Sequence, residues 1–310
     1  MKMVDVAAAV ILNPDGSFLL GQRAADTFYP GYWEFPGGKV EEEETPREAL
    51  ERELHEELEI EVLRAYPWIV REHVYEHAHV RLHFFRVVEW RGELKGHVHA
   101  ALAWQRPGGA TVFPMLPANA PILAALALPG TYAITHAHEI GVDAQLTALE
   151  KALRKGVGLV QLREAALPAD KREPFVAAAV ALCHKHNARV LVNGDAQLAW
   201  AVGADGLHLP GVQLQGLRGR PAFPLVAASC HDAAELKRAA EYGLDFAVLG
   251  PVKSTATHPG NPGMGWQRFA ELVRGLPLPV YALGGLDGGD MESALLAGAQ
   301  GIAAIRGAWV

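Results

Sequence analysis

The second half of the chain repeats one unit, a short apolar segment followed by a stretch rich in Ala and Leu. Most helical stretches between the segments end in Gly or Asn, as helix C-caps favour. Alternating strands and helices of this kind favour parallel strands joined by crossover helices. Eight units at regular spacing predict a closed (β/α)8 TIM barrel, with an open doubly wound sheet as the alternative. The eight segments span 131–135, 158–163, 189–193, 205–209, 224–229, 246–250, 279–285 and 301–307.

Residues 1–128 follow a different pattern, in which strand-like stretches surround one strong helix. Apolar runs on both sides of the Asn-Pro-Asp-Gly stretch at 13–16 predict a β-hairpin. A closing helix is expected from 117 to 128, and Leu128-Pro129-Gly130 ends it. We therefore expect two domains, 1–128 and 131–310, in a chain whose 310 residues suit two.

Charge and composition narrow the classes of function. The net charge of −7 argues against a binder of duplex nucleic acid, which needs a dense basic face. We also expect no membrane segment, because no apolar run approaches the roughly 20 residues of a spanning helix. The two cysteines, Cys183 and Cys230, lack a metal-ligand spacing and are interpreted as buried small hydrophobes. These features are typical of a cytoplasmic enzyme.

One helix of the first domain is crowded with carboxylates. Thr45-Pro46-Arg47-Glu48 forms a capping box with Pro at the first helical position, so the helix is expected to begin at Pro46. Three glutamates, Glu53, Glu56 and Glu57, share one face at spacings of three and four. A divalent cation would relieve their mutual repulsion, while a solvated acidic face is the alternative. Leucines spaced by four supply the buried stripe: Leu50, Leu54 and Leu58.

This stretch resembles the Nudix box, Gly-x5-Glu-x7-Arg-Glu-U-x-Glu-Glu-x-Gly-U, where U is aliphatic. The resemblance implies a mixed-sheet α/β (α+β) Nudix fold that hydrolyses a nucleoside diphosphate linked to another group. It implies that Gly38, Glu53, Glu56 and Glu57 bind Mg²⁺, or alternatively Mn²⁺, and that Arg52 orients the catalytic glutamates. One position departs, because Glu59 stands where the family has Gly. The matching positions are Gly38, Glu44, Arg52, Glu53, Leu54, Glu56, Glu57 and Ile60.

Residues 22–26, 33–39 and 113–126 extend the similarity to the MutT branch of the family, which hydrolyses the oxidised nucleotide 8-oxo-dGTP and so limits DNA damage. On that resemblance Asn119 contacts the purine edge, while Phe35 and Arg23 lie near the base. A helix-capping Asn and an ordinary core Phe are the alternatives. A second departure is Val98, which stands where a carboxylate is expected.

Two pairs of alternate histidines invite comparison with a transition-metal site. His77 and His79 form one pair, and His97 and His99 form the other. Alternate residues of a strand face the same side, but no third ligand is set by spacing. We interpret all four as exposed strand histidines.

The second half resembles thiamine-phosphate synthase and the related thiazole tautomerase across 131–310, through stretches such as GLVQLRE, LGPVKSTATHPG and LGGL. The resemblance implies a thiamine-related phosphate ligand at the C-terminal ends of the strands, and barrels of this family often form homodimers. Arg306-Gly307 and the Gly pair before it follow the last two strands, the usual phosphate corner, although tight turns would explain the glycines equally well. The candidate phosphate-binding residues are Thr255, Thr257, Gly284 and Gly285.

The barrel departs from the synthase pattern where that family binds Mg²⁺. Asn193-Gly194-Asp195 replaces Asn-Asp-Arg, and Gln213 replaces a second metal-binding Asp. Two family lysines are also missing, at Ala165 and His258. We therefore expect a barrel that binds a phosphorylated ligand without synthase activity. The alternatives are a bifunctional enzyme with synthase or tautomerase activity, and a hydrolase of another nucleoside or thiamine-pathway diphosphate beside a non-catalytic barrel.

Overall fold

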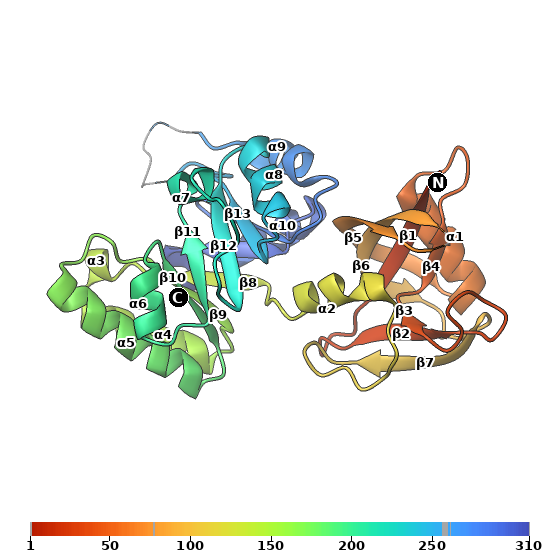
Figure 1. Cartoon of the computed structure of the whole chain (residues 1–310), viewed down its shortest axis with the longest axis horizontal. Helices are drawn as coiled ribbons and strands as arrows, with labels where there is room; N and C mark the ends of the chain where they lie inside the picture. Colours follow the sequence, from red (N-terminus) through yellow and green to blue (C-terminus); the bar gives the residue numbers. More distant parts are fainter. Residues whose placement is uncertain (1, 77, 256–259, 261, 310) are drawn as a thin grey trace. The chain divides into compact units, whose positions relative to one another are not determined.

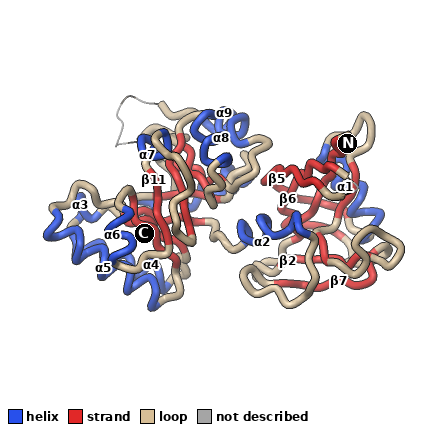
Figure 2. The backbone as a smooth tube through the Cα atoms, in the orientation of Figure 1, coloured by secondary structure: helices blue, strands red, loops and turns tan. Residues whose placement is uncertain are grey.

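A computed structural model describes residues 2–76, 78–255, 260 and 262–309. The chain forms two compact units, Met1–Leu128 and Pro129–Val310. Figure 1 follows both along the chain from red to blue, and Figure 2 shows where their helices and strands lie. Within the described residues, none of the helices has the length and apolar character needed to cross a membrane.

The first unit is built on two sheets, with helix α1 (Pro46–Leu58) on the larger one. The order in the larger sheet is β4-β1-β6-β5, and β1 runs parallel to β6 but antiparallel to β4. The smaller sheet has the order β3-β2-β7. A short 3-10 helix, η1 (Pro117–Asn119), leads into α2 (Ala120–Leu126). The strands are β1 (Met3–Ile11), β2 (Phe18–Arg23), β3 (Trp33–Glu34), β4 (Gly37–Lys39), β5 (Glu61–Val74), β6 (His79–Arg91) and β7 (His99–Gln105).

The hairpin expected around 13–16 is confirmed at its turn but is wrong along its strands. The turn itself forms, since the Gly16 N–H donates to the Asn13 carbonyl at 2.9 Å. However, β1 and β2 enter different sheets and meet only at the bridge between Leu12 and Phe18. Both edges of β1 are already paired, to β4 and to β6, so β2 pairs elsewhere. A turn signal predicts the reversal of the chain but not the strand that fills the neighbouring edge.

Helix α1 forms for the reasons that the sequence predicted. Thr45 accepts from the Glu48 N–H, and the Glu48 side chain accepts from the Thr45 N–H, which completes the capping box. The leucine stripe is fully buried in a core shared with β1 and β6. Because the stripe fixes the rotation of the helix, the glutamates between the leucines must face the loop before it. The buried residues of α1 are Ala49, Leu50, Leu54 and Leu58.

The second unit is a closed barrel of eight parallel strands, which confirms the barrel and excludes the open sheet. The strands close in the order β10-β11-β12-β13-β14-β15-β8-β9, and Figure 2 shows helices packed beside them. They are β8 (Thr131–Ile134), β9 (Leu159–Leu162), β10 (Arg189–Asn193), β11 (Gly206–Leu209), β12 (Leu225–Cys230), β13 (Phe246–Leu249), β14 (Val280–Leu283) and β15 (Gly301–Ala304). The helices are α3 (Ala137–Ile140), α4 (Val142–Arg154), α5 (Ala169–Lys185), α6 (Ala196–Ala201), α7 (Gly211–Gln215), α8 (Ala233–Glu241), α9 (Gly265–Val273) and α10 (Met291–Leu296), with 3-10 turns η2 (Gly288–Asp290) and η3 (Arg306–Ala308).

Aromatic side chains fill the inside of the barrel. The Tyr132 ring packs edge-on against Phe246 with centroids 5.1 Å apart, and Phe246 packs against Tyr281 at 5.3 Å. All three are completely buried. The Tyr281 hydroxyl donates to the Pro129 carbonyl at 2.6 Å, which ties this layer to the start of β8. The barrel interior at this layer is therefore a packed core rather than a pore.

Candidate functional sites

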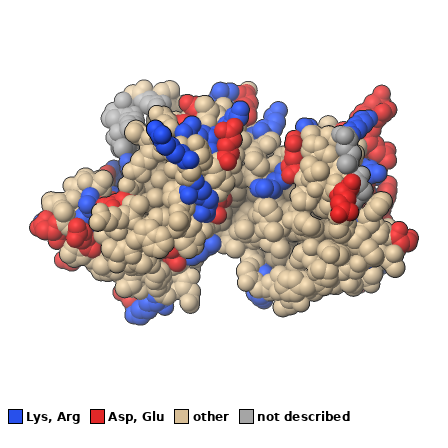
Figure 3. Space-filling view, in the orientation of Figure 1, with Lys and Arg blue, Asp and Glu red and all other residues tan. Residues whose placement is uncertain are grey.

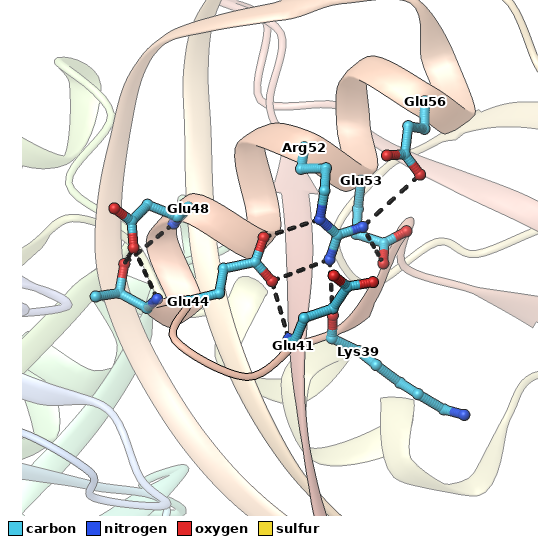
Figure 4. A network of polar contacts seen from close by, with 8 residues as sticks. Lys39, Glu41, Glu44, Glu48, Arg52, Glu53 and Glu56 are labelled. Atoms are coloured by element: carbon cyan, nitrogen blue, oxygen red, sulfur yellow. Dashed lines mark hydrogen bonds and ion pairs between the residues drawn. The ribbon is translucent and has the colours of Figure 1, made fainter.

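Arg52 is the centre of a polar network on α1, shown in Figure 4. Its Nε and Nη2 donate to the two carboxylate oxygens of Glu44 at 2.8 and 3.0 Å, a bidentate pair. Its Nη1 donates to Glu53 at 2.9 Å, and its Nη2 also donates to the Lys39 carbonyl at 3.0 Å. The guanidinium thus ties α1 to the loop that precedes it and fixes the carboxylate of Glu53.

The turn from β4 meets α1 through two glycines. Gly38 lies so close to Glu53 that a Cβ there would fall 2.1 Å from the Glu53 carboxyl carbon. The Gly37 N–H donates to Glu57 at 3.1 Å. Burial raises the pKa of Glu57 to about 8, against the Gly37 hydrogen bond, and the charges of Glu53 and Glu34 raise it further. Two carboxylates and a glycine turn therefore converge at one end of the sheet.

The donor set of this site fits a hard divalent cation. Carboxylate and backbone carbonyl oxygens are the ligands that Mg²⁺ takes. Burial is the main cause of the raised Glu57 pKa, and a cation would offset the smaller contribution that comes from repulsion by Glu53. The geometry is open, because in the part of the chain that the structure describes no three His, Cys, Asp or Glu side chains converge as a metal site. The Glu56 side chain is 60% exposed and lies 3.7 Å from Arg52. Gly38, Glu53 and Glu57 would hold the ion, with Glu56 at its solvent side.

Glu59, the departure from the box, ends α1, and Val98, the departure from the MutT pattern, comes directly after His97, which contacts Glu59. Glu59 caps the helix in the left-handed conformation, with φ 55° and ψ 33°, where a glycine is favoured. Its carboxylate pairs with Lys95 at 2.9 Å and with His97 at 2.6 Å, and the Lys95 hydrogen bond is the main cause of its lowered pKa. Val98 follows directly and is 50% exposed. The helix end keeps its geometry despite the substitution at Glu59.

Of the three candidate base-contacting residues, Phe35 belongs to the segment 33–35, and Arg23 and Asn119 each bond to a residue of that segment. Arg23 donates to Glu34 at 2.5 Å, a partner that the sequence did not indicate. Asn119 is buried and its amide donates to the Trp33 carbonyl at 3.0 Å, without capping α2. Phe35 is buried between Phe18 and Phe84, with centroids 5.9 and 5.8 Å away, and so packs as a core residue. Burial raises the pKa of Glu34, against its pairing with Arg23.

The barrel carries a cavity of about 590 Å³ at the C-terminal ends of its strands. Three of the four candidate phosphate residues line it, namely Thr255, Gly284 and Gly285, while Thr257 lies outside the described residues. The two glycines also answer a steric need: a Cβ at Gly284 would fall 2.6 Å from Pro251, and one at Gly285 2.6 Å from the Ser254 carbonyl. Both have positive φ, so tight turns account for them as well as a ligand does.

Comparisons with known proteins match the two units separately. A family model described as "NUDIX domain" matches residues 1–126, and one described as "Thiamine monophosphate synthase" matches residues 131–308. The chain is 44% identical over 131 residues to the CTP pyrophosphohydrolase of Escherichia coli, covering 40% of this chain and 92% of that relative. It is 32% identical over 186 residues to the thiamine-phosphate synthase of Thioalkalivibrio sulfidiphilus, covering 58% of this chain and 87% of that relative.

This chain belongs to the NUDIX and thiamine monophosphate synthase families. A solved MutT NUDIX hydrolase from Burkholderia pseudomallei is 28% identical, covers 40% of this chain and 97% of its own, and has a TM-score of 0.37. The N-terminal unit is hereafter the NUDIX domain, and the C-terminal unit the synthase-family barrel. The expected fusion of the two families is confirmed.

A polar chain inside the synthase-family barrel was not indicated by the sequence. His208 is fully buried; its Nε2 lies 2.8 Å from the Ser229 hydroxyl and its Nδ1 lies 3.2 Å from the Tyr132 hydroxyl. Ser229 lines the 590 Å³ cavity. Burial lowers the pKa of His208 to about 3, helped by the charge of Arg163, so the imidazole is neutral at ordinary pH. Alternate strand residues that face the barrel interior are the one signal that could have found it.

At the barrel positions where the synthase family binds its metal, the residues of this chain bond to other groups of the protein. The Gln213 amide donates to the Gly194 carbonyl at 2.8 Å. Asp195 accepts from the Leu198 N–H at 2.9 Å and so caps α6. His258, the other departure in the following loop, lies outside the described residues. This donor set does not fit a divalent cation, because the one carboxylate at these positions already serves a helix.

The three strand histidines that the structure describes, His79, His97 and His99, each have a different neighbour. His97 contacts Glu59, whereas the His99 ring lies against Gly21, where a Cβ would fall 2.2 Å away. His79 is 3.6 Å from Glu72, and His77 lies outside the described residues. Burial and the charge of Arg23 lower the pKa of His99.

Figure 3 shows basic and acidic side chains interspersed on the face that it draws, with no continuous basic stripe among the residues described there.

Proposed function

We propose that the NUDIX domain hydrolyses a nucleoside triphosphate to the monophosphate and pyrophosphate, with 8-oxo-dGTP as the preferred substrate. Water adds to the substrate as one phosphoanhydride bond breaks, so the oxygen of water ends on one product. A bound Mg²⁺ supplies charge neutralisation of the phosphates and activation of that water. The residues of the chain hold the ion and position the oxygens around it.

The observation that carries the proposal is the register of α1 against the glycine turn. Arg52 fixes Glu53 beside Gly38, while Glu57 accepts from the Gly37 N–H. Two carboxylates beside a backbone turn support a site that binds a cation together with a polyphosphate. Glu53 is our choice for activating water, because its carboxylate is both oriented by Arg52 and only 16% exposed.

The proposed preference for an oxidised purine rests on Asn119 and on the Arg23–Glu34 pair. The Asn119 side-chain amide is oriented because its N–H donates to the Trp33 carbonyl. The side-chain oxygen of Asn119 can then accept a hydrogen bond from a base edge. A donor beside an acceptor is the pattern that the edge of 8-oxoguanine presents. The relative named CTP pyrophosphohydrolase makes cytosine nucleotides the second candidate class.

The test is a substrate comparison with Mg²⁺. We expect 8-oxo-dGTP to be converted with a kcat/KM at least about tenfold above those of dGTP and CTP, which corresponds to about 1.4 kcal/mol of discrimination. Glu53→Gln should abolish most of the turnover, while Glu51→Gln, an exposed residue of the same helix, should keep it. Equal rates on all three nucleotides contradict the proposed preference, and an active Glu53→Gln contradicts the proposed site.

A second function is proposed for the barrel, which binds a thiamine-related phosphate without synthase turnover. Its support is the 590 Å³ cavity with Thr255 and the two glycines, together with the loss of metal ligands at Gly194 and Gln213. Thiazole phosphate or thiamine phosphate should raise the melting temperature of the barrel in EDTA. Pyrophosphate release from the two precursors would instead establish a synthase, and isomerisation of the thiazole would establish a tautomerase. If neither binding nor turnover is observed, the role of the barrel is purely structural.

A further inference from the structure

The loop 92–98, between β6 and β7, lies against the last turn of α1. The last carbonyl groups of a helix have no partner within the helix and are satisfied from outside it. The Lys95 N–H donates to the Leu58 carbonyl at 3.1 Å. The His97 N–H donates to the Glu57 carbonyl at 3.0 Å. The loop therefore forms part of the C-terminal cap of α1.

The side chain of Glu59 holds the same two loop residues a second time. Its Oε2 accepts from the Lys95 ammonium group at 2.9 Å, and its Oε1 lies 2.6 Å from Nε2 of His97. Each oxygen of one carboxylate thus meets a different residue of the loop. Backbone and side-chain contacts together join the loop to the end of α1.

Stability alone does not account for a glutamate at this position. Glu59 has φ 55° and ψ 33°, a left-handed conformation that is strained for a residue with a Cβ. Its partners Lys95 and His97 are exposed, and exposed ion pairs stabilise a fold little. Strained backbone that the surrounding structure keeps in place is characteristic of functional sites. The contacts of the Glu59 carboxylate therefore point to a positioning role.

The group that the loop holds in place is Glu57, one of the proposed metal ligands. The Glu57 carboxylate accepts from the Gly37 N–H at 3.1 Å, and the Glu57 backbone carbonyl accepts from His97. The first contact sets the carboxylate against the glycine turn, and the second sets the backbone from which the side chain extends. A shift of the loop would therefore move the Glu57 carboxylate relative to Gly38 and Glu53.

We propose that Glu59 is a positioning residue of the NUDIX site, whose carboxylate holds the loop against α1 and so keeps Glu57 in place for a divalent cation. Glu59 acts through the loop and not as a ligand, because both of its oxygens are bonded to Lys95 and His97. The glycine of the box has no side chain that could do this. The role of Glu59 depends on the proposed function, because the cation is that of the same site.

Binding of Mn²⁺ to the full chain, without nucleotide, tests this role. The EPR signal of free Mn²⁺ decreases as the ion binds, and the part of the binding that Glu53→Gln removes belongs to the NUDIX site. We expect Glu59→Gln to weaken that part by about tenfold, the lower end of the effect of groups that orient metal ligands. Unchanged affinity in Glu59→Gln overturns the proposal.

The variant Lys95→Gln separates positioning from simple electrostatics. Removal of a positive charge near a cation site strengthens cation binding, whereas release of the loop weakens it. We expect Lys95→Gln to weaken Mn²⁺ binding, in the same direction as Glu59→Gln, and stronger or unchanged binding overturns the proposal. Arg91→Gln is the matched control, since Arg91 directly precedes the loop but pairs with Glu61. It should not weaken the binding, and a loss equal to that of Lys95→Gln also overturns the proposal.

The loop amides report the same contacts without a metal ion. In Glu59→Gln and in Lys95→Gln, the His97 amide that donates to the Glu57 carbonyl should exchange with deuterium faster than in wild type. An unchanged exchange rate in both variants shows that the carboxylate does not hold the loop and overturns the proposal.

The Mn²⁺ measurement also separates failure of this role from failure of the proposed function. If wild type binds no Mn²⁺ that Glu53→Gln removes, the metal site of the proposed function is contradicted, and the role of Glu59 with it. If wild type binds the ion there and the variants of Glu59 and Lys95 bind it equally well, only the positioning role is contradicted.

Discussion

At the scale of single residues, Arg52 connects two carboxylates and a backbone carbonyl of the NUDIX site. It makes a bidentate pair with Glu44 and a further bond to Glu53, so one guanidinium orients the loop and the carboxylate together. Groups that orient metal ligands are a recurrent part of metal sites, and their loss typically costs about 10- to 100-fold in metal affinity or activity.

We therefore predict that Arg52→Gln lowers the apparent affinity for Mg²⁺ by about 10- to 100-fold. Arg52→Lys should not restore it, because an ammonium group cannot replace the bidentate fork. The measurement is the Mg²⁺ dependence of turnover. Arg47→Gln is the control, since Arg47 lies on the same helix but pairs with Glu51. If the two glutamine variants behave alike, Arg52 has no special role in positioning.

The two cysteines give a second prediction at this scale. Cys183 and Cys230 are both buried, and burial raises the pKa of Cys183 to about 12 and also raises that of Cys230. Neither thiol is therefore an accessible thiolate at pH 8. We expect a thiol-labelling reagent to leave the native protein unmodified and to label both cysteines in denaturant. Fast labelling of the native protein would contradict the burial of these side chains.

At the scale of elements, the C-terminus of α1 shows how a helix accommodates a glutamate at a position that favours glycine. Glu59 holds a left-handed conformation that costs a non-glycine residue roughly 1 kcal/mol. The ion pairs of its carboxylate with Lys95 and His97 are exposed, and pairs of that kind stabilise little. The backbone strain is thus the larger effect at this position.

Two variants separate these contributions. Glu59→Gly and Glu59→Ala both lose the carboxylate, but only glycine relieves the backbone. We predict that α1 in the glycine variant is more stable than in the alanine variant by about 1 kcal/mol. Hydrogen–deuterium exchange of the α1 amides measures the difference. Equal protection in the two variants would show that the left-handed cap is not strained.

The elements also show what could be predicted from the sequence. The capping box, the leucine stripe and the barrel follow local periodicity, so they were predictable residue by residue. The pairing of β2 could not be predicted in this way, because it depends on the strands that occupy the two edges of β1. The same holds for Arg23 with Glu34 and for His208 with Tyr132, whose contacts join separate elements. The grouping of Glu53, Glu56 and Glu57 on α1 was predictable because their offsets lie on one helix.

At the scale of the whole molecule, two families share one chain but differ in how they use carboxylates. In the NUDIX domain, Glu53 and Glu57 lie together beside a glycine turn. In the barrel, Glu164 and Asp195 lie apart at the starts of α3 and α6, where they accept from backbone N–H groups. The requirement for a divalent cation should therefore belong to the first domain alone.

The stability of the barrel should depend on pH through His208, whose pKa of about 3 in the folded state lies below the roughly 6.5 of an unfolded chain. Below pH 6.5 the histidine binds a proton in the unfolded chain but not in the folded barrel. The free energy of unfolding therefore decreases as the pH is lowered. The contribution of His208 to the free energy of unfolding is fully present above pH 6.5. Between pH 6.5 and pH 3 it decreases by about 1.4 kcal/mol for each unit by which the pH is lowered.

The comparison of wild type with His208→Gln isolates this group from other titrating residues. Glutamine can still bond Ser229 or Tyr132 but has no proton to take up near neutral pH. We predict that urea unfolding of the barrel at pH 7.5, 6.5 and 5.5 shows a steeper loss of stability in wild type than in the variant, although the variant starts lower. Parallel pH profiles would show that His208 takes up its proton over the same pH range in the folded barrel as in the unfolded chain, and would contradict its lowered pKa.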